Sequence, residues 1–174
     1  IDPRIFDNDF ITLLAANEKV CRQFHISLQS GSAGVLSRMN RKYTPEQYLS
    51  AVEKIRRAMP DAAITTDIIC GFPGETDSEF EETKEFVRKA RFARVHVFPY
   101  SEREGTAAAK MKQLNKEVRE KRAKELFEIT ENIRAEFEES FIGSTHGVLF
   151  EQSADGVSEG LTKNYLRIYV NSEK

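Results

Sequence analysis

Three short apolar runs alternate with two amphipathic segments, and this order constrains the fold more than any other feature of the chain. The runs at 23–29, 62–71 and 93–101 have strand character, and the segments between them have the apolar spacing of helices. Short links between such elements join parallel strands through right-handed crossovers. The sequence therefore predicts an α/β fold whose parallel strands form a sheet or a barrel.

Capping signals mark where the helices begin. Thr44 and Gln47 form a capping box at the first helix of the alternation, and Thr76 and Glu79 form one at the second. A further helix is predicted over residues 7–17. The apolar residues that these three helices are predicted to turn toward the core are Phe10, Leu13, Leu14, Tyr48, Leu49, Val52, Ile55, Met59, Phe80, Phe86 and Val87.

The character of the chain changes after residue 110. "NKEVREKRAKELFEITENIRAEFEESFIG" predicts one long charged helix that stops at Gly143. Three strand-like runs follow, near 145–151, 156–161 and 165–170, and Asp155-Gly156 and Lys163-Asn164 separate them as hairpin turns do. We therefore expect a small antiparallel β module after the α/β body.

Composition sets limits on the function. The chain has 174 residues, a net charge of −2, 40% hydrophobic and 31% charged residues, so it lacks the basic character of a non-specific nucleic-acid binder. Its two cysteines are too far apart for a zinc or iron–sulfur motif, which favours packed, reduced thiols. No membrane-spanning window or signal peptide is visible, so the cytoplasm is the default location. The start at Ile1 without a methionine suggests an excised piece of a longer protein.

The three predicted strands end in segments rich in glycine, serine and proline: "LQSGS", "GFPG" and "PYSEREGT". Each segment alone could be a tight turn and nothing more. In parallel α/β folds, however, ligands bind at the carboxyl ends of the strands. Together, the three segments predict the rim of one cleft.

The alternation within the strands places two polar side chains in that cleft. Ile64, Ile68 and Cys70 share the phase that packs under helices, so Asp67 faces inward, beside Gln29. A buried carboxylate needs partners, which a ribose diol would supply. The alternative is a structural aspartate bonded to Thr65 or to backbone amides.

The turn "GFPG" does not fit a phosphate site. It lacks the Gly-Lys-Ser/Thr sequence of a Walker loop and the spaced glycines of a dinucleotide turn, and Pro73 removes a donor while Glu75 adds a negative charge. The turn fits better as a place where the backbone comes close to a flat, uncharged group of a ligand. The prediction is a nucleoside, with its adenine at this turn.

Three ordered blocks carry a family resemblance. "HISLQSGSAGVLSRMNRKYT", "TTDIICGFPGET" and "HVFPYSEREGTAAAKM" resemble the radical S-adenosylmethionine methylthiotransferases that modify tRNA. "RKYT" and "HVFPYS" are most similar to the branch that acts on threonylcarbamoyladenosine. Proteins of this family use S-adenosylmethionine and two [4Fe–4S] clusters to insert a methylthio group at C2 of the modified adenosine.

The resemblance implies a domain plan. Residues 1–140 would be the C-terminal half of a partial, TIM-like (β/α) barrel with its long closing helix, and residues 141–174 would be a truncated TRAM-like β domain. The cluster cysteines of the family have no counterpart in this chain. The resemblance therefore implies a fragment that binds no cluster, is inactive alone and supplies the strand ends that bind S-adenosylmethionine.

The resemblance also implies site residues. Gln29 and Asp67 match positions that hold the ribose hydroxyls, and Arg41 matches a position that pairs with the methionyl carboxylate. The positions that would border the adenine are Ile69, Gly71, Pro99 and Ser101. The positions that could contact tRNA are Arg103, Lys163 and Arg167. His25 and His96 are expected to be core or lumen residues.

Other interpretations stay open. A relative with the same chemistry could act on another tRNA adenosine or on a ribosomal protein, and an α/β module without catalysis could bind RNA or protein. For the isolated chain we expect self-association through an open barrel edge, because an unpaired strand edge and an apolar lumen face would be exposed.

Overall fold

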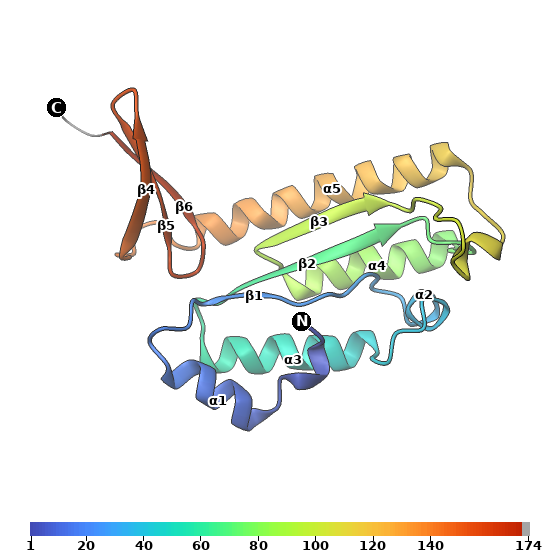
Figure 1. Cartoon of the computed structure of the whole chain (residues 1–174), viewed down its shortest axis with the longest axis horizontal. Helices are drawn as coiled ribbons and strands as arrows, with labels where there is room; N and C mark the ends of the chain where they lie inside the picture. Colours follow the sequence, from blue (N-terminus) through green and yellow to red (C-terminus); the bar gives the residue numbers. More distant parts are fainter. Residues whose placement is uncertain (172–174) are drawn as a thin grey trace.

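The computed structural model describes residues 1–171, which form two β-sheets joined by a long helix (Figure 1). The first sheet is parallel, with strands β1 (Gln23–His25), β2 (Ala63–Cys70) and β3 (Arg94–Pro99) in the order β1-β2-β3. The second is antiparallel. This is the α/β class predicted from the alternation of elements. No helix in the described range combines the length and the apolarity needed to cross a membrane.

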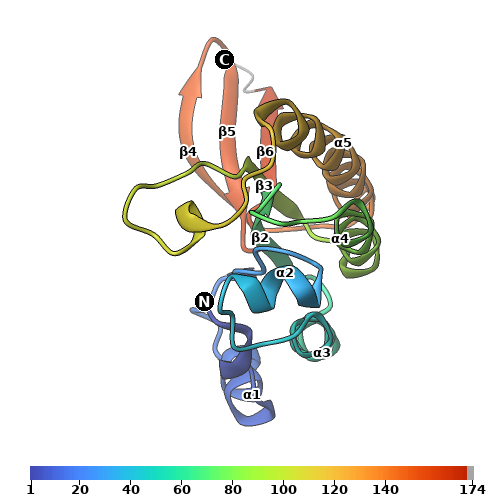
Figure 2. The same ribbon diagram turned by 90° about the vertical axis from the view of Figure 1, so that its right-hand side faces the viewer.

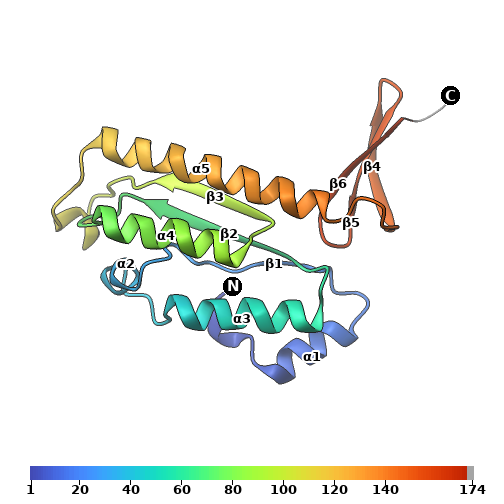
Figure 3. The same cartoon turned by 180° about the vertical axis from the view of Figure 1, so that it is seen from behind.

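Three helices cover one face of the parallel sheet and leave the other face open (Figure 2). They are α3 (Pro45–Ala58), α4 (Asp77–Ala90) and α5 (Lys116–Glu139), and seen from behind they lie in front of the strands (Figure 3). The largest side chains fully buried beneath them include Tyr48, Ile55, Ile64, Ile68, Phe92 and Leu126. Each contributes about 1.5–3 kcal/mol by leaving water, which makes this layer the main source of stability.

Both predicted capping boxes are confirmed. Thr44 and Gln47 bond reciprocally at the start of α3, and Thr76 and Glu79 do so at the start of α4. Glu79 also accepts a hydrogen bond from Arg38 at 2.7 Å. Arg38 ends α2 (Ala33–Arg38), a short helix that the sequence did not predict, so Glu79 ties α2 to α4.

The first helix, α1 (Asn8–Ala16), forms where predicted, but its buried face is different. Leu13 is 65% exposed, whereas Ile11 is 4% exposed and Phe10 and Leu14 are partly buried. Ile11 and Leu14 are three residues apart and share a side of the helix, while Leu13 lies two residues from Ile11 and points away. The predicted core position of Leu13 was therefore wrong.

The first strand ends earlier than predicted, because the chain gains one residue relative to its neighbour. His25 lies opposite Thr65, and the next bridge joins Gln29 to Ile68, so residues 26–28 face residues 66 and 67. Gln29 absorbs the difference with a left-handed backbone, φ 73°. This conformation costs a non-glycine residue about 1–2 kcal/mol.

The second sheet stands at the amino ends of the parallel strands, where α5 delivers the chain (Figure 1). It contains β4 (Val148–Ala154), β5 (Val157–Thr162) and β6 (Arg167–Asn171) in sequence order. The predicted hairpin at Asp155-Gly156 is confirmed, with both residues at positive φ. The β5–β6 turn reaches the α/β body, because the carbonyl of Lys163 accepts from the amide of Arg22 at 2.8 Å.

We expect Glu79 to make stability depend on pH. Its hydrogen bond from Arg38 is the main reason why the pKa of Glu79 lies below its ordinary value of 4.5. A carboxylate with a lowered folded-state pKa stabilises the protein above the unfolded value and loses that contribution as the pH falls through the folded value. Glu79→Gln should therefore lower the free energy of unfolding by about 1 kcal/mol at neutral pH and flatten its decline in acid.

Urea unfolding measured between neutral pH and the acid range checks this expectation. Glu82→Gln is the matched control, since Glu82 is exposed on the same helix. If the free energy of unfolding declined equally in acid for Glu79→Gln and for the unmodified protein, the expectation would be contradicted.

Candidate functional site

The open face of the parallel sheet carries rows of neighbouring side chains. Thr65, Asp67 and Ile69 of β2 lie opposite Arg94, His96 and Phe98 of β3, respectively. Alternate residues of a strand point to the same side, and the intervening residues of β2 are buried under the helices. The predicted inward phase of Asp67 and Ile69 is therefore the phase of the open face.

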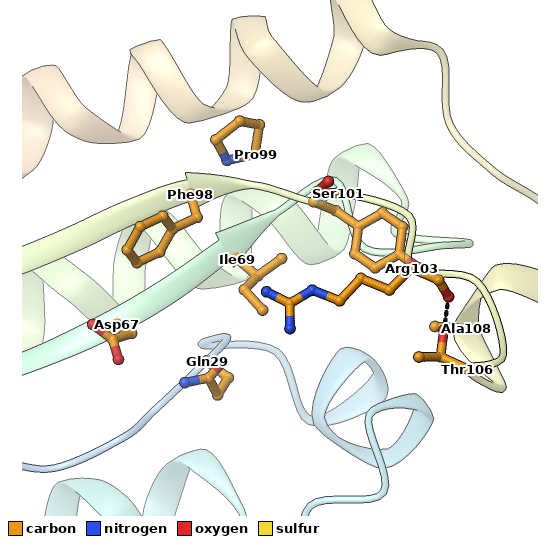
Figure 4. A pocket seen from close by; sticks show the side chains of 10 residues that line it. Gln29, Asp67, Ile69, Phe98, Pro99, Ser101, Arg103, Thr106 and Ala108 are labelled. Carbon is orange, nitrogen blue, oxygen red and sulfur yellow. Dashed lines mark hydrogen bonds between the residues drawn. The ribbon is translucent and has the colours of Figure 1, made fainter.

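A cavity of about 500 Å³ lies at the carboxyl end of this face (Figure 4). Of the predicted site residues, it brings together Gln29, Asp67, Ile69, Pro99, Ser101 and Arg103. Its other lining residues are Phe98, Tyr100, Thr106 and Ala108. The predicted rim segments "LQSGS" and "PYSEREGT" thus contribute to one cavity, whereas no residue of "GFPG" lines it.

Gln29 presents an uncommitted amide to the cavity. Its backbone is fixed on both sides, since its N–H donates to the carbonyl of Asp67 at 2.9 Å and its carbonyl accepts from Ile69 at 3.0 Å. Its side chain is largely buried, yet it has no hydrogen-bond partner within residues 1–171. A donor and an acceptor therefore remain for a ligand.

Within residues 1–171, the carboxylate of Asp67 has one hydrogen-bond partner, which the sequence did not predict. Its Oδ2 lies 3.2 Å from Nε2 of His25, while Thr65 contacts the other ring nitrogen at 3.1 Å. The structural alternative considered from the sequence, a bond to Thr65 or to backbone amides, is not what the structure shows. Oδ1 of Asp67 has no partner in the described part of the chain.

Two of the predicted cofactor-binding residues lie outside the cavity lining. Arg41 is exposed in the segment that joins α2 to α3. Gly71 lies in the buried turn after β2, where a Cβ would come within 2.5 Å of Cγ of Arg119. With φ at +71°, glycine suits this position for backbone reasons as well.

The two candidate RNA contacts of the β module lie at the opposite end of the sheet. Lys163 donates from Nζ to the carbonyl of Glu18 at 3.2 Å. Arg167 forms an ion pair with Glu159 across the hairpin. Both side chains are exposed, and neither lines the cavity.

The turn "GFPG" is held by a buried ion pair. Glu75 accepts from the amide of Gly71 at 2.9 Å and from Arg122 at 2.7 Å, and Arg122 also donates to Asp77. Burial raises the pKa of Glu75, and the bonds from Gly71 and Arg122 oppose this only in part. The Glu75 carboxylate thus points into the protein, away from any ligand, which corrects the role expected for it.

Sequence reasoning missed the aromatic part of the cavity. Phe98 is 50% exposed on the open face, and Tyr100 packs edge-on against Phe72 with ring centroids 5.4 Å apart. The alternation within "HVFPYS" already placed Phe98 on the same phase as His96, so this signal was available. Arg122 gave no such signal, because it resembles the other charges of a long polar helix.

The cavity combines apolar walls with free polar atoms, as small-molecule sites do. Apolar surface from Ile69 and Phe98 lies beside the free polar atoms of Gln29 and Asp67, and the volume falls within the range of small-molecule sites. Within residues 1–171, no group of three or more His, Cys, Asp or Glu side chains could hold a metal ion. Cys21 is exposed, and burial raises the pKa of the Cys70 thiol, which keeps it protonated.

A second cavity of about 550 Å³ lies at the amino end of the same face. It extends from His25 and His96 to the turn of the β module at Tyr165 and Arg167. His25 therefore lies between the two cavities, with Asp67 on its other side. The two histidines occupy the lumen-like face, as expected from the sequence.

Comparisons with known proteins show what this chain is similar to. Residues 2–87 match the model of the Radical SAM superfamily. The tRNA-2-methylthio-N(6)-dimethylallyladenosine synthase of Saccharopolyspora erythraea is 49% identical over 81% of this chain, and that of Endomicrobium trichonymphae is 39% identical over 99%. The chain spans 29% and 41% of the lengths of these two proteins.

A solved structure shows the same fold. Coproporphyrinogen III oxidase from Escherichia coli, a radical SAM enzyme, matches 76% of this chain and 31% of its own with a TM-score of 0.64 and 21% identity. This likeness concerns the arrangement of strands and helices alone.

We expect Arg122 to anchor the turn beside the cavity. Arg122→Met should lower the free energy of unfolding by about 3–5 kcal/mol, because it leaves Glu75 buried without its partner. Lys121→Met is the matched control, since Lys121 is exposed on the same helix, and it should change stability by less than about 0.5 kcal/mol. Urea unfolding measures both. Similar losses in the two variants would contradict the anchoring role.

Proposed function

We propose that this chain, which carries part of a radical SAM domain and is homologous to tRNA methylthiotransferases, supplies S-adenosylmethionine-binding strand ends to an enzyme that inserts a methylthio group at C2 of a modified adenosine in tRNA. One observation carries the proposal. Gln29 and Asp67 offer free polar atoms beside Ile69 and Phe98 in one cavity at the carboxyl ends of the strands.

The chain's own residues would position the cofactor. Asp67 and Gln29 would accept and donate hydrogen bonds at the ribose hydroxyls. The adenine would lie against the apolar wall, bordered by Ile69, Pro99 and Ser101. Gly71, which lies outside the cavity lining, would border the adenine only through the backbone of its turn. Arg41 would reach the methionyl carboxylate from the α2–α3 segment. S-adenosylmethionine with a reduced [4Fe–4S] cluster supplies radical chemistry that no side chain provides.

Contacts with tRNA would come from both ends of the open face. Arg103 lines the cavity, and its guanidinium suits a phosphate or a stacked base. Lys163 and Arg167 would contribute from residues 141–174, the proposed TRAM-like part, while residues 1–140 form the barrel part. A tRNA substrate also places the protein in the cytoplasm.

Two nucleosides are candidates for the substrate. The similar proteins from Saccharopolyspora erythraea and Endomicrobium trichonymphae are named for dimethylallyladenosine, which favours that nucleoside. The segments "RKYT" and "HVFPYS" favour threonylcarbamoyladenosine, and that assignment stays a prediction. The cavity described above would serve either enzyme, because it holds the cofactor and not the base that is modified.

Mass spectrometry of tRNA nucleosides tests the proposal. A strain that lacks the full gene should lose one methylthio-adenosine derivative and accumulate its unthiolated precursor. The wild-type gene should restore the product, and an allele with Asp67→Ala should restore less than about a tenth of it, because the ribose loses a charged partner. Asp9→Ala, which removes an exposed carboxylate from α1, is the matched control and should restore it fully.

The identity of the missing nucleoside decides the substrate. Loss of the dimethylallyl derivative or of the threonylcarbamoyl derivative selects between the two candidates. Unchanged tRNA together with an altered ribosomal protein would shift the reaction to another substrate. No change in any methylthio product would favour a binding module without catalysis.

For residues 1–174 expressed alone, we propose self-association through the open barrel edge and the apolar surface beside it. Phe98 is 50% exposed in the cavity, and Leu149 of the β module is 72% exposed. Sedimentation at rising concentration should show a mass above that of the monomer, which Phe98→Lys reduces. Leu13→Lys, at a 65% exposed position on α1, is the matched control. A protein that stays monomeric at all concentrations would contradict the proposed self-association.

A further inference from the structure

Polar side chains form a hydrogen-bonded row across the open face, and this row links the two cavities. Gln23 Nε2 lies 2.9 Å from Thr65 Oγ1, which lies 3.1 Å from His25 Nδ1. On the other side of the ring, His25 Nε2 lies 3.2 Å from Asp67 Oδ2. The row thus begins in the cavity at the amino end and finishes on the carboxylate of the cavity at the carboxyl end.

The chemistry of Gln23 and Asp67, at the two ends of the row, determines which atom donates in each hydrogen bond. The amide nitrogen of Gln23 only donates, so Thr65 accepts from it and keeps its own hydrogen for another partner. A carboxylate only accepts, so the hydrogen between His25 and Asp67 belongs to Nε2. In a neutral ring with its hydrogen on Nε2, Nδ1 accepts from the Thr65 hydroxyl. These four groups fit together when His25 is neutral and carries its hydrogen on Nε2.

The row contributes little to stability. The side chains of His25 and Asp67 are 38% and 32% exposed, and a pair that is this accessible to water is worth about 1 kcal/mol or less. Its larger effect is on geometry. One oxygen of Asp67 is held by the ring, so rotation of the carboxylate is restricted and the other oxygen keeps a fixed direction.

We propose that His25 is a positioning residue, which holds Oδ2 of Asp67 through its Nε2–H and thereby presents Oδ1 to the hydroxyl groups of a ribose. This inference rests on the proposed function, in which Asp67 takes the ribose of S-adenosylmethionine. Thr65 fixes the ring from the opposite nitrogen. Partners of this kind at metal sites change affinity by about 10–100-fold, and we expect about tenfold here because His25 is partly exposed.

Calorimetry on the full-length gene product tests the inference with two probes. One is S-adenosylhomocysteine, and the other is its 2′,3′-dideoxy analogue, which lacks the hydroxyls that Asp67 would hold. His25→Leu should weaken binding of the first probe about tenfold and leave the second unchanged. His25→Gln should restore most of the affinity, because its amide nitrogen can donate to Asp67 from nearly the position of Nε2.

Two further variants keep the test independent of a folding defect in His25→Leu. Thr65→Val removes the support of the ring and should also weaken only the probe that carries hydroxyls. In an Asp67→Ala background, His25→Leu should have no further effect on either probe, because the two residues act through one contact.

The outcomes separate the inference from the proposed function. If the unmodified protein binds both probes equally well, or binds neither, Asp67 does not hold a ribose, and the proposed placement of the cofactor is overturned together with the role of His25. If it prefers the hydroxylated probe but His25→Leu weakens both probes equally, or weakens neither, the placement stands and the positioning role is overturned.

Discussion

Parallel pairing of three strands under a single layer of helices is the constraint on which the rest of the structure depends. Because α3, α4 and α5 seal one face, Thr66, Ile68 and Cys70 of β2 are buried under the helices, and Asp67 and Ile69 lie half-buried on the open face. Helix packing therefore decides that Asp67 and Ile69 reach the cavity while Ile68 and Cys70 do not. The chemistry of the open face follows from the burial of the opposite face.

The extra residue that follows β1, within residues 26–28, adapts this regular sheet to a site. Without it, Gln29 would continue the strand. With it, the backbone of Gln29 turns left-handed and its amide and carbonyl bond to Asp67 and Ile69, the two β2 residues that line the cavity. Strained residues of this kind concentrate where a ligand is held. The extra residue would leave the amide of Leu28 without a partner on the neighbouring strand. The hydroxyl of Thr66 accepts a hydrogen bond from that amide instead.

Much of the fold and part of the site could be predicted from the sequence, because these features depend on residues that are close together in the chain. Both capping boxes, the extent of β2 and the inward phase of Asp67 follow from spacing over a few residues. Contacts between distant segments could not be predicted. Arg122 is 47 residues from Glu75 and looks like any charge on a polar helix, and the bulge at Gln29 depends on a hydroxyl of another strand. The predicted burial of Leu13 was wrong because a short helix offers more than one apolar face.

The β module changes what the open face can accommodate. Two hydrogen bonds fix the turn between β5 and β6 to the α/β body. The backbone amide of Arg22 donates to the carbonyl of Lys163, and the side-chain amide of Asn164 donates to the carbonyl of Asp61 at 3.0 Å. That turn lines the cavity at the amino end, whereas the loop after β3 lines the cavity at the carboxyl end. Helix α5, about 36 Å long at 1.5 Å per residue, separates the two ends. An RNA that touches both Arg103 and Arg167 must therefore lie along the open face, across the row that ends at Asp67.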